Sequence, residues 1–390
     1  MKFILRPIIL LTLILNTIIL SSCDNDEPEP TPQANRTILV YMVARNTLGA
    51  YQYDQNDLNE MLEAASSPEG LNGGRLLVFH APISGAPQLK EITAQGINIL
   101  KEYDQSISCV ESKTMQQIIT DAKAFAPAND YGLILWSHAN GWLQTGIADS
   151  SYIEPASLRN NNLKPTAFGE DKRQNMNVTT LAQTLKNQQF SFIYFDCCYM
   201  ACVEVAYEMR HTTPYIIAST TEILGDGMPY NANLKHLFAD TPQLVEACQN
   251  TFDFYNTRLD ESRTCTISLI KTSGMEDLAS ATRNIYATKA FADKSYKPQR
   301  FMTEVRCYHF DLADHIHSLP VEKSLLEKWD NAIADVVIYS NNTPYLWNIL
   351  KINSHCGLST YILDDNQDYS ANKYKYFELQ WWNDVVSHRF

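Results

Sequence analysis

The chain has 390 residues, of which 45% are hydrophobic and 19% are charged. This composition supplies apolar material for a large buried core and excludes disordered, collagen-like and coiled-coil proteins. Thirty-one Lys and Arg against 44 Asp and Glu give a formal net charge of −13. Because such a charge repels a phosphate backbone, it argues against nucleic acid as a partner and favours cationic substrates.

The first 23 residues have the features of an export signal. Residues 1–6 carry basic side chains, residues 8–20 are apolar, and the sequence LSSC follows with Cys23 as its last residue. This pattern resembles a bacterial lipoprotein signal, so we interpret residues 1–22 as a signal peptide and Cys23 as the site of lipid attachment. A plain membrane helix is the alternative, because the apolar stretch is near the minimum spanning length of about 17 residues.

Residues 23–36 are acidic and rich in proline. Such a segment cannot bury enough apolar surface to fold, so we expect an extended tether. An acidic tract beside the lipid-bearing cysteine resembles the signal that places lipoproteins on the surface of Bacteroides-type bacteria. The expected location is therefore the outer membrane or cell surface with a lipid anchor, and a simple solvated spacer is the alternative.

From residue 37 onward, short apolar runs bounded by turn residues predict strands. They lie at 37–44, 75–81, 131–138, 190–196 and 215–219, with weaker ones at 265–270 and 357–363. Segments with helical spacing lie between them at 57–65, 114–125, 179–186 and 203–210. Strands this apolar are covered on both faces, and their alternation with helices is typical of an α/β fold with a parallel sheet.

Two further segments differ from this alternation. Residues 143–177 are polar and lack periodicity, and a connection of that length is usually functional. From about residue 230, helical patterns at 244–259 and 324–340 predominate. We expect one main globular unit over 37–390, with 230–390 either part of it or a C-terminal subdomain.

Chemically reactive side chains follow two neighbouring predicted strands. The run 131–136 leads into His138, and the run 190–195 leads into Cys197 and Cys198. Functional groups gather at the carboxyl ends of strands in open α/β sheets. An imidazole beside a thiol can hold the sulfur as thiolate and later protonate a leaving amine, and a following helix should lower the thiol pKa further.

Three other interpretations of these cysteines remain open. They fit a buried core, since cysteine is among the most buried residue types. An exported chain also permits disulfides, and besides Cys23 it has eight cysteines, at 109, 197, 198, 202, 248, 265, 307 and 356. A metal cluster of three cysteines with His138 lacks the usual ligand spacing.

Three segments carry a resemblance to a known family. They are YGLILWSHANGW, FSFIYFDCCYMACVEVAYEM and YIIASTTEILGDGMPY, and they resemble the clostripain family of cysteine endopeptidases, relatives of caspases, gingipains and legumains. The similarity runs from TILVYMVARNTL to FELQWWNDV and so covers nearly the whole chain from residue 37. It implies a caspase-like α/β sandwich, a mostly parallel central sheet flanked by helices, with helical C-terminal additions.

The resemblance also assigns roles. The Asp-Ala-Cys motif of the family falls on residues 196–198, which makes Cys198 the nucleophile, and His138 takes the place of the general acid and base. The backbone N–H groups of Cys198 and Ala139 would hold the oxyanion. The commonest family pattern has glycine where this chain has Ala139, a change that costs about 1 kcal/mol or more if the backbone φ must be positive. A second departure is Cys197, which replaces alanine.

The resemblance implies cleavage after Arg or Lys, with Asp196 and Asp226 lining the pocket for the basic residue (the S1 site). A carboxylate binds a guanidinium by a bidentate pair, which favours Arg over Lys. The alternatives are that Asp226 is a turn residue between two glycines and that Asp196 caps the following helix.

Members of the family are often cut between the His and Cys strands, and Arg159 is our choice for self-cleavage, with a harmless surface insertion as the alternative. No cofactor is required for the chemistry. Asp364, Asp365 and Asp368 could bind calcium, which some relatives need, although a solvated turn fits them as well.

The sequence thus predicts a membrane-tethered endopeptidase that acts on protein or peptide substrates with basic residues. The rival interpretation is a catalytically inactive relative that binds peptide or glycan at the cell surface, with Ala139 and Cys197 as signs of its drift from the active pattern.

Overall fold

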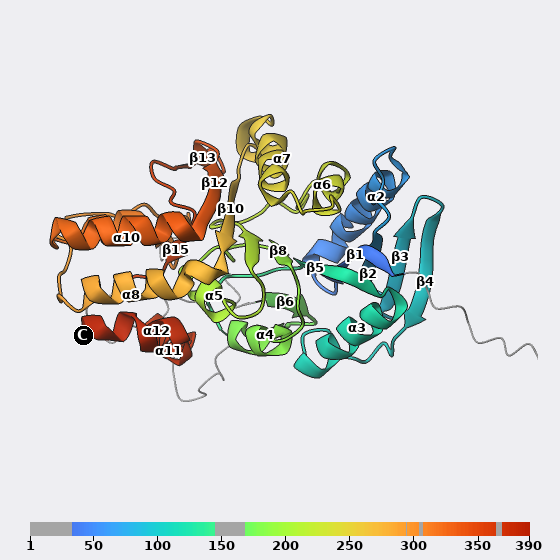
Figure 1. The fold of residues 1–390 in the computed structure, drawn as a ribbon, viewed down its shortest axis with the longest axis horizontal. Helices are drawn as coiled ribbons and strands as arrows, with labels where there is room; N and C mark the ends of the chain where they lie inside the picture. The colour runs from blue at the N-terminus through green and yellow to red at the C-terminus, as the bar shows by residue number, and fades with distance from the viewer. Residues whose placement is uncertain (1–32, 145–167, 294, 304–306, 364–368) are drawn as a thin grey trace, which may run out of the picture. The chain divides into compact units, whose positions relative to one another are not determined.

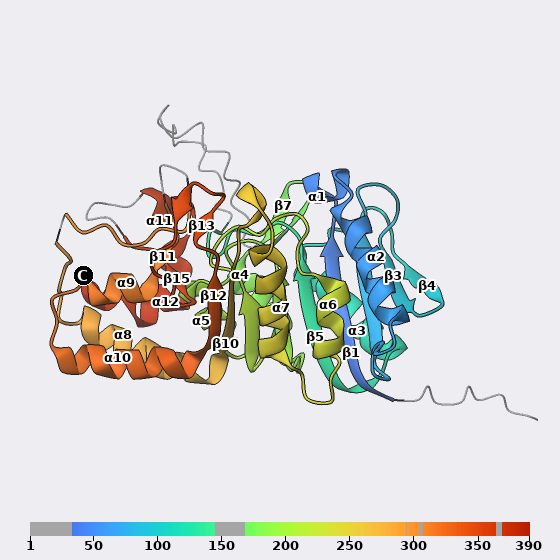
Figure 2. The same cartoon turned by 90° about the horizontal axis from the view of Figure 1, so that it is seen from above.

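A nine-stranded mixed sheet organises the chain, in the order β12-β10-β9-β8-β5-β1-β2-β3-β4 (Figures 1 and 2). The computed structural model describes residues 33–144, 168–293, 295–303, 307–363 and 369–390. Residues 33–390 form one compact unit.

The five central strands run parallel. They are β1 (Ala34–Val43), β2 (Arg75–Ala81), β5 (Ala128–Trp136), β8 (Phe192–Asp196) and β9 (Tyr215–Ala218). All five coincide with apolar runs that predict strands, and nearly every residue in them is buried. The expected α/β fold with a mostly parallel centre is confirmed, because only strands covered on both faces need such continuous apolar sequence.

The two edges of the sheet are antiparallel. One edge holds β10 (Thr266–Lys271) and β12 (Val337–Asn342), and the other holds β3 (Gln88–Thr93) and β4 (Gly96–Glu102). β3 and β4 were not predicted from the sequence, because edge strands with one solvated face lack a continuous apolar run. The helix predicted to extend to residue 340 ends earlier, since the chain leaves it at Val337 and pairs with β10.

The strand predicted at 357–363 is largely wrong. Only Ser359–Thr360 (β15) pairs there, and it pairs with β11 (Phe310–Asp311) outside the main sheet. The next residue, Tyr361, donates its backbone N–H to the Glu204 carboxylate at 2.9 Å. Side-chain and loop partners take the place of a ladder, so the apolar run packs as an irregular segment.

Helices cover both faces of the sheet (Figure 1). On one face are α2 (Tyr53–Ser66), α6 (Tyr230–Leu237) and α7 (Leu244–Asn256), and on the other are α3 (Ser112–Phe125), α4 (Val178–Leu185) and α5 (Val203–Glu208). Alternate residues of β1 divide between two cores: Ile38 and Val40 pack with the first group of helices, and Leu39 and Tyr41 pack with the second. This is the period of two that a strand imposes on its side chains.

The C-terminal part adds helices beyond the β12 edge (Figure 1). These are α8 (Met275–Tyr286), α9 (Leu312–His317), α10 (Lys323–Val336), α11 (Tyr369–Lys373) and α12 (Gln380–Asp384). The remaining short elements are α1 (Thr47–Ala50), β6 (Phe168–Asp171), β7 (Gln174–Met176), β13 (Tyr345–Leu346) and β14 (Leu350–Lys351), together with short 3-10 turns.

A buried glutamate joins the C-terminal part to α5. Glu204 has no exposed surface, and its Oε1 accepts hydrogen bonds from the Thr360 hydroxyl at 3.0 Å, the Tyr361 N–H at 2.9 Å and the Tyr376 hydroxyl at 3.3 Å. Burial raises the pKa of Glu204 to about 7, and the three donors offset part of that rise. The charged carboxylate is therefore costly in the folded state.

The substitution Glu204→Gln should change how stability depends on pH. An unfolded glutamate has a pKa of about 4.3, so the folded chain binds more protons between that pH and about 7, and its stability falls as pH rises through this window. Relative to wild type, the variant should gain up to about 3 kcal/mol in free energy of unfolding between pH 4 and pH 8. Urea unfolding at several pH values measures this, with the exposed Glu246→Gln as control. A difference that stays constant with pH would contradict the assignment.

Candidate active site

The carboxyl ends of four parallel strands, β1, β5, β8 and β9, lie at one edge of the sheet. β5 and β8 pair with Trp136 opposite Asp196, so His138 and Cys198 each lie two residues beyond the last pair of adjacent strands. Both residues are half-buried. β1 ends beside β5 and β9 beside β8, so the segments after these strands flank the two residues.

The segment after β1 contacts His138. The Thr47 Oγ1 lies 2.7 Å from His138 Nε2. The preceding residue, Ser137, donates its hydroxyl to the Val43 carbonyl at 2.9 Å and receives the Asn46 Nδ2 at 3.3 Å. These bonds hold the end of β5 against the end of β1, so the position of the imidazole is set by both strands.

The β6–β7 hairpin fixes the same segment from the other side. The Gly169 N–H donates to the His138 carbonyl at 2.9 Å, and the Glu170 N–H donates to the Ser137 hydroxyl at 3.1 Å. Ala139 forms an antiparallel bridge with Phe168, and its φ is not positive. The strain expected from alanine in place of glycine is therefore absent. The Ala139 N–H donates to no backbone acceptor among the described residues, which suits it to an oxyanion.

Cys198 lies in a tight turn beneath the loop that follows β9, residues 219–229. The Ile223 N–H donates to the Cys198 Sγ at 3.3 Å, and the thiol reaches the Ile223 carbonyl at 3.7 Å. The next residue, Tyr199, has φ of 61°, an uncommon conformation for a residue with a side chain. The nucleophile candidate is thus held by the backbone of a neighbouring loop.

The expected lowering of the thiol pKa is wrong for this structure. α5 has six residues and begins only at Val203, with Cys202 as its N-cap, so its N-terminus does not start at the thiol. Burial is the main cause that raises the pKa of Cys198 to about 12; Glu222 and Asp196 raise it further, and the Ile223 N–H lowers it. The thiol is protonated at neutral pH in this state.

The other cysteines behave as core residues. Cys197 is 2% exposed, and burial raises its pKa well above the usual value. All eight cysteines in the described part of the chain are free, so the disulfide alternative finds no bridge among them. Within the same described part, no group of three or more His, Cys, Asp or Glu is arranged to hold a metal ion.

Asp196 lies beneath the loop. It is 5% exposed and accepts hydrogen bonds from the Met228 N–H and the Tyr230 hydroxyl, both at 3.0 Å. It does not cap α5. Gly227, at φ of 60°, packs against the carboxylate, because a Cβ there would lie 2.8 Å from Asp196 Oδ2. Burial raises the pKa of Asp196 to about 6.

Asp226 lies on the same loop and is more exposed. The Gly227 N–H donates to the Leu224 carbonyl at 2.9 Å, so Asp226 is indeed part of a turn. Its carboxylate pairs with Arg258 at 2.5 Å. A cavity of about 10 Å³ is lined by Asp196 at the end of β8, by Gly227 and other residues of the loop after β9, and by residues of β10 and α7. That space holds about one water molecule and is too small for an arginine side chain.

Three residues at this edge were not predicted from the sequence. Thr47 lies four residues beyond the carboxyl end of β1, so the rule that drew attention to His138 applied to it as well. Ile223 and Arg258 carried no such signal, because one contributes only its backbone and the other comes from the end of a helix far along the chain. The expected lipidation site Cys23, the cleavage site Arg159 and the acidic calcium candidates at 364, 365 and 368 lie outside the described residues.

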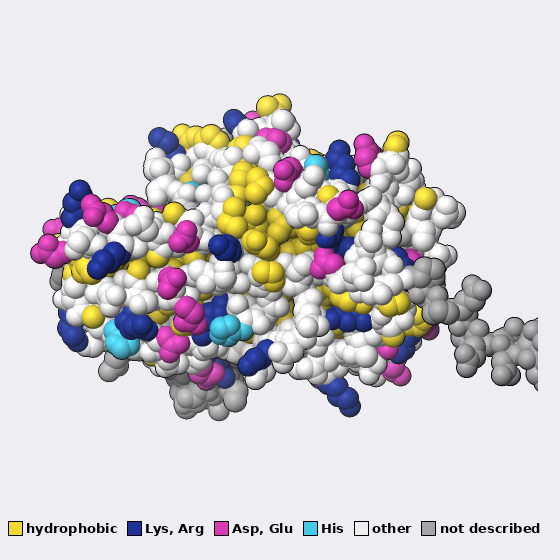
Figure 3. All heavy atoms as spheres, viewed as in Figure 1, with side chains coloured by type: hydrophobic (Ala, Val, Ile, Leu, Met, Phe, Trp, Pro, Cys, Tyr) yellow, Lys and Arg dark blue, Asp and Glu magenta, His cyan; other side chains and the backbone are white. Residues whose placement is uncertain are grey.

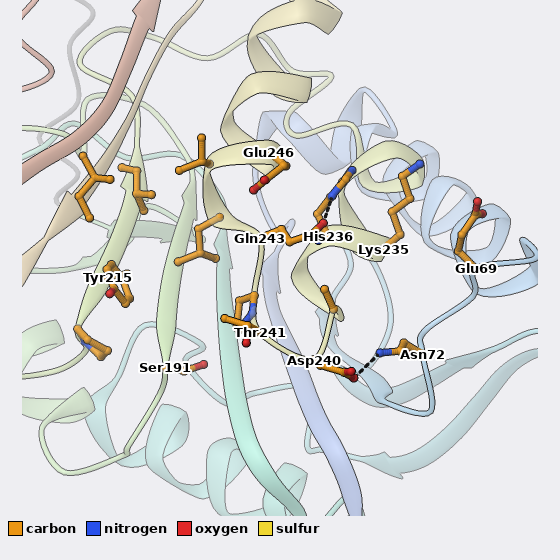
Figure 4. A pocket seen from close by; sticks show the side chains of 17 residues that line it. Glu69, Asn72, Ser191, Tyr215, Lys235, His236, Asp240, Thr241, Gln243 and Glu246 are labelled. Carbon is orange, nitrogen blue, oxygen red and sulfur yellow. Dashed lines mark hydrogen bonds between the residues drawn. The ribbon is translucent and has the colours of Figure 1, made fainter.

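A large groove lies elsewhere, at the amino ends of the strands (Figure 4). Its volume is about 1130 Å³, and it is lined by residues that precede or begin strands, such as Ser191 and Tyr215, and by the segment 239–246. Val245 and Ile338 line it and are exposed. Hydrophobic side chains gather near the middle of the face shown in Figure 3. None of the predicted site residues that the structure describes lines this groove.

The raised pKa of Cys198 predicts slow alkylation. In the unprocessed chain, iodoacetamide should label Cys198 slowly at pH 7 and faster up to at least pH 10, because only the thiolate reacts. Mass spectrometry of labelled peptides measures the rate, and Cys198→Ala and Cys197→Ala separate the adjacent cysteines. Rapid labelling of Cys198 that is already maximal at pH 6 would show a stabilised thiolate and contradict this description.

Comparison with solved structures supports the same fold. An inactive zymogen of a C11 protease from Parabacteroides distasonis is 29% identical with a TM-score of 0.74, and the match covers 91% of this chain and 99% of that one. A secreted C11 cysteine protease from Bacteroides thetaiotaomicron, in complex with an irreversible peptide inhibitor, is 27% identical with a TM-score of 0.75, covering 90% and 98%.

A third structure is a clostripain from Bacteroides thetaiotaomicron in complex with the peptide inhibitor BTN-VLTK-AOMK. It is 26% identical with a TM-score of 0.50, and the match covers 57% of this chain and 97% of that one. A search of curated proteins finds no match. A family model described as the clostripain family matches residues 40–385. With the His and Cys segments at one edge of a caspase-like sheet, the chain belongs to the clostripain family.

Proposed function

We propose that this chain is a cysteine endopeptidase in which Cys198 is the nucleophile and His138 the general acid and base. The observation that carries the proposal is the pairing of β5 with β8, which sets both residues at the same level on adjacent strands. A dyad of this kind needs a thiol and an imidazole at one edge of the sheet, and both residues are half-buried at that edge.

The proposed reaction proceeds through a thioester. The Cys198 sulfur adds to the peptide carbonyl, His138 gives a proton to the leaving amine, and water then releases the acid product. The N–H groups of Cys198 and Ala139 hold the oxyanion. Since Thr47 contacts Nε2 of His138, we assign the proton transfer to Nδ1.

The described conformation fits a state that precedes activation. The thiol is covered by Ile223 and carries a raised pKa, so nucleophilic attack requires the loop 219–229 to move and the imidazole to pair with the sulfur. A relative from Parabacteroides distasonis is described as an inactive zymogen. We propose that cleavage after Arg159 contributes to activation of this chain.

The proposed substrates are proteins or peptides with a basic residue at the cleaved bond. Asp196 and Asp226 supply carboxylates near Cys198, and the chain as a whole has a net charge of −13. One clostripain structure holds an inhibitor whose peptide part, VLTK, ends in the letter for lysine. We propose Arg as the preferred residue, because its guanidinium binds a carboxylate at two points, with Lys also accepted.

We propose that the chain is exported and anchored by lipid at Cys23. A relative from Bacteroides thetaiotaomicron is described as secreted. In the described part of the chain, none of the helices combines the length and apolar character that crossing a membrane requires. The proposed chemistry uses side chains and backbone groups only, without a cofactor.

Exchange of each adjacent cysteine tests the nucleophile. Cys198→Ala should abolish hydrolysis of an Arg-ended fluorogenic peptide, whereas Cys197→Ala should retain most of it, since Cys197 lies in the core. The assay needs reducing conditions and is run with and without calcium and after limited proteolysis. No turnover under any of these conditions would favour the inactive relative that binds peptide or glycan.

Substitution of Thr47 tests the orientation of His138. Thr47→Val keeps the shape but loses the hydroxyl, and the loss of one hydrogen bond should lower kcat/KM by roughly five- to tenfold. Thr47→Ser keeps the hydroxyl and should stay near wild type. Steady-state kinetics with the same peptide measures both variants. Equal activity in the two variants would contradict the proposal that the Thr47 hydroxyl orients His138.

A further inference from the structure

Arg258 forms an ion pair with Asp226, the more exposed of the two proposed S1 carboxylates. Its Nη1 lies 2.5 Å from Asp226 Oδ2, and its guanidinium lies over the rings of Phe254 at 4.2 Å and Tyr255 at 5.0 Å. We infer that Arg258 is a specificity-determining residue, which holds Asp226 until a basic substrate side chain takes its place. This inference rests on the proposed function of Asp226.

The ion pair between Arg258 and Asp226 is one of several contacts that fix the position of the loop 219–229. The Tyr255 hydroxyl, in the last turn of α7, donates to the Gly227 carbonyl at 2.6 Å, so α7 and the residues just after it contact the loop at two points. The same loop contributes the Ile223 N–H to the thiol of Cys198 and the Met228 N–H to Asp196. One loop therefore covers the nucleophile, closes the space above one acid and carries the other.

Substrate binding requires this loop to move, because the cavity beside Asp196 is only about 10 Å³. Movement breaks the pair between Arg258 and Asp226. A substrate arginine restores the lost contact with a guanidinium of the same charge and shape, whereas a neutral residue leaves the carboxylate without a partner. Binding of a basic residue thus exchanges one ion pair for another.

The pair is suited to such an exchange. The side chain of Asp226 is 45% exposed and that of Arg258 is 25% exposed, so solvent screens their attraction and replacement is not strongly opposed. Stacking on Phe254 and Tyr255 keeps the guanidinium close to the carboxylate. Arg258 consequently acts as a tethered competitor of weak affinity and not as a permanent block.

The test compares Arg258→Ala with Arg263→Ala. Arg263 lies five residues further on and bonds to the Asn256 side chain, so its removal takes away the same charge without touching Asp226. Arg258→Ala should lower KM for an Arg-ended peptide about fivefold with kcat unchanged, a gain that corresponds to the loss of one screened, stacked pair. Arg263→Ala should leave KM as in wild type.

A second measurement does not depend on turnover. Benzamidine, a cationic amidine, should protect Cys198 from iodoacetamide at about fivefold lower concentration in Arg258→Ala than in wild type. The double variant Arg258→Ala with Asp226→Asn should lose that gain. Protection that is unchanged or weaker in Arg258→Ala would overturn the inference and make the pair structural. If Arg258→Ala melts at a lower temperature than wild type, Arg258→Gln replaces it in both measurements. This variant removes the charge but keeps the aliphatic part of the side chain over Phe254.

These readouts separate the two proposals. Absence of hydrolysis in every variant, with benzamidine protection still improved in Arg258→Ala, would count against the proposed activity but support the exchange at Asp226. Normal hydrolysis of Arg-ended peptide with no change on removal of Arg258 would support the activity and reject the exchange.

Discussion

The parallel pairing of β5 with β8 is the constraint on which the rest of the site depends. Because Trp136 lies opposite Asp196, the residues that follow the two strands leave the sheet together, and His138 and Cys198 emerge at the same edge. A shift of one residue in either strand would turn every side chain beyond it to the other face. Alternate residues of both strands pack into two different cores, so such a shift would disrupt packing on both faces, and the core fixes the position of the proposed dyad.

The loop after β9 links the proposed nucleophile to the proposed specificity pocket. Its Ile223 backbone contacts the thiol, and a few residues later Asp226 pairs with Arg258. Asp226 lies in the turn that the Gly227 N–H closes onto the Leu224 carbonyl, and Ile223 directly precedes that turn, so movement of one of these contacts changes the other. In the described state the loop covers the thiol and closes the pocket. One loop conformation therefore lowers both the reactivity of Cys198 and the access of a substrate side chain.

The C-terminal part supports the turn that carries the proposed nucleophile. His309 stacks on Tyr199 with ring centroids 4.6 Å apart, and a Cβ at Gly141 would lie 2.6 Å from His309. The same part holds α5 through its three hydrogen bonds to Glu204. The unusual φ of Tyr199 is thus maintained by packing from residues more than a hundred positions later in the chain.

The sequence by itself determined the five central strands and the placement of His138 and Cys198 at their ends, because buried parallel strands need continuous apolar runs that are visible without a structure. It also carried the family resemblance that assigned Ala139, Asp196 and Asp226. Only the tertiary structure decided the edge strands, the contact of Thr47 with the imidazole, the occupation of Asp226 by Arg258 and the raised pKa of the thiol. These depend on which distant segments meet and on how much water they exclude, and neither quantity is encoded in local pattern or spacing.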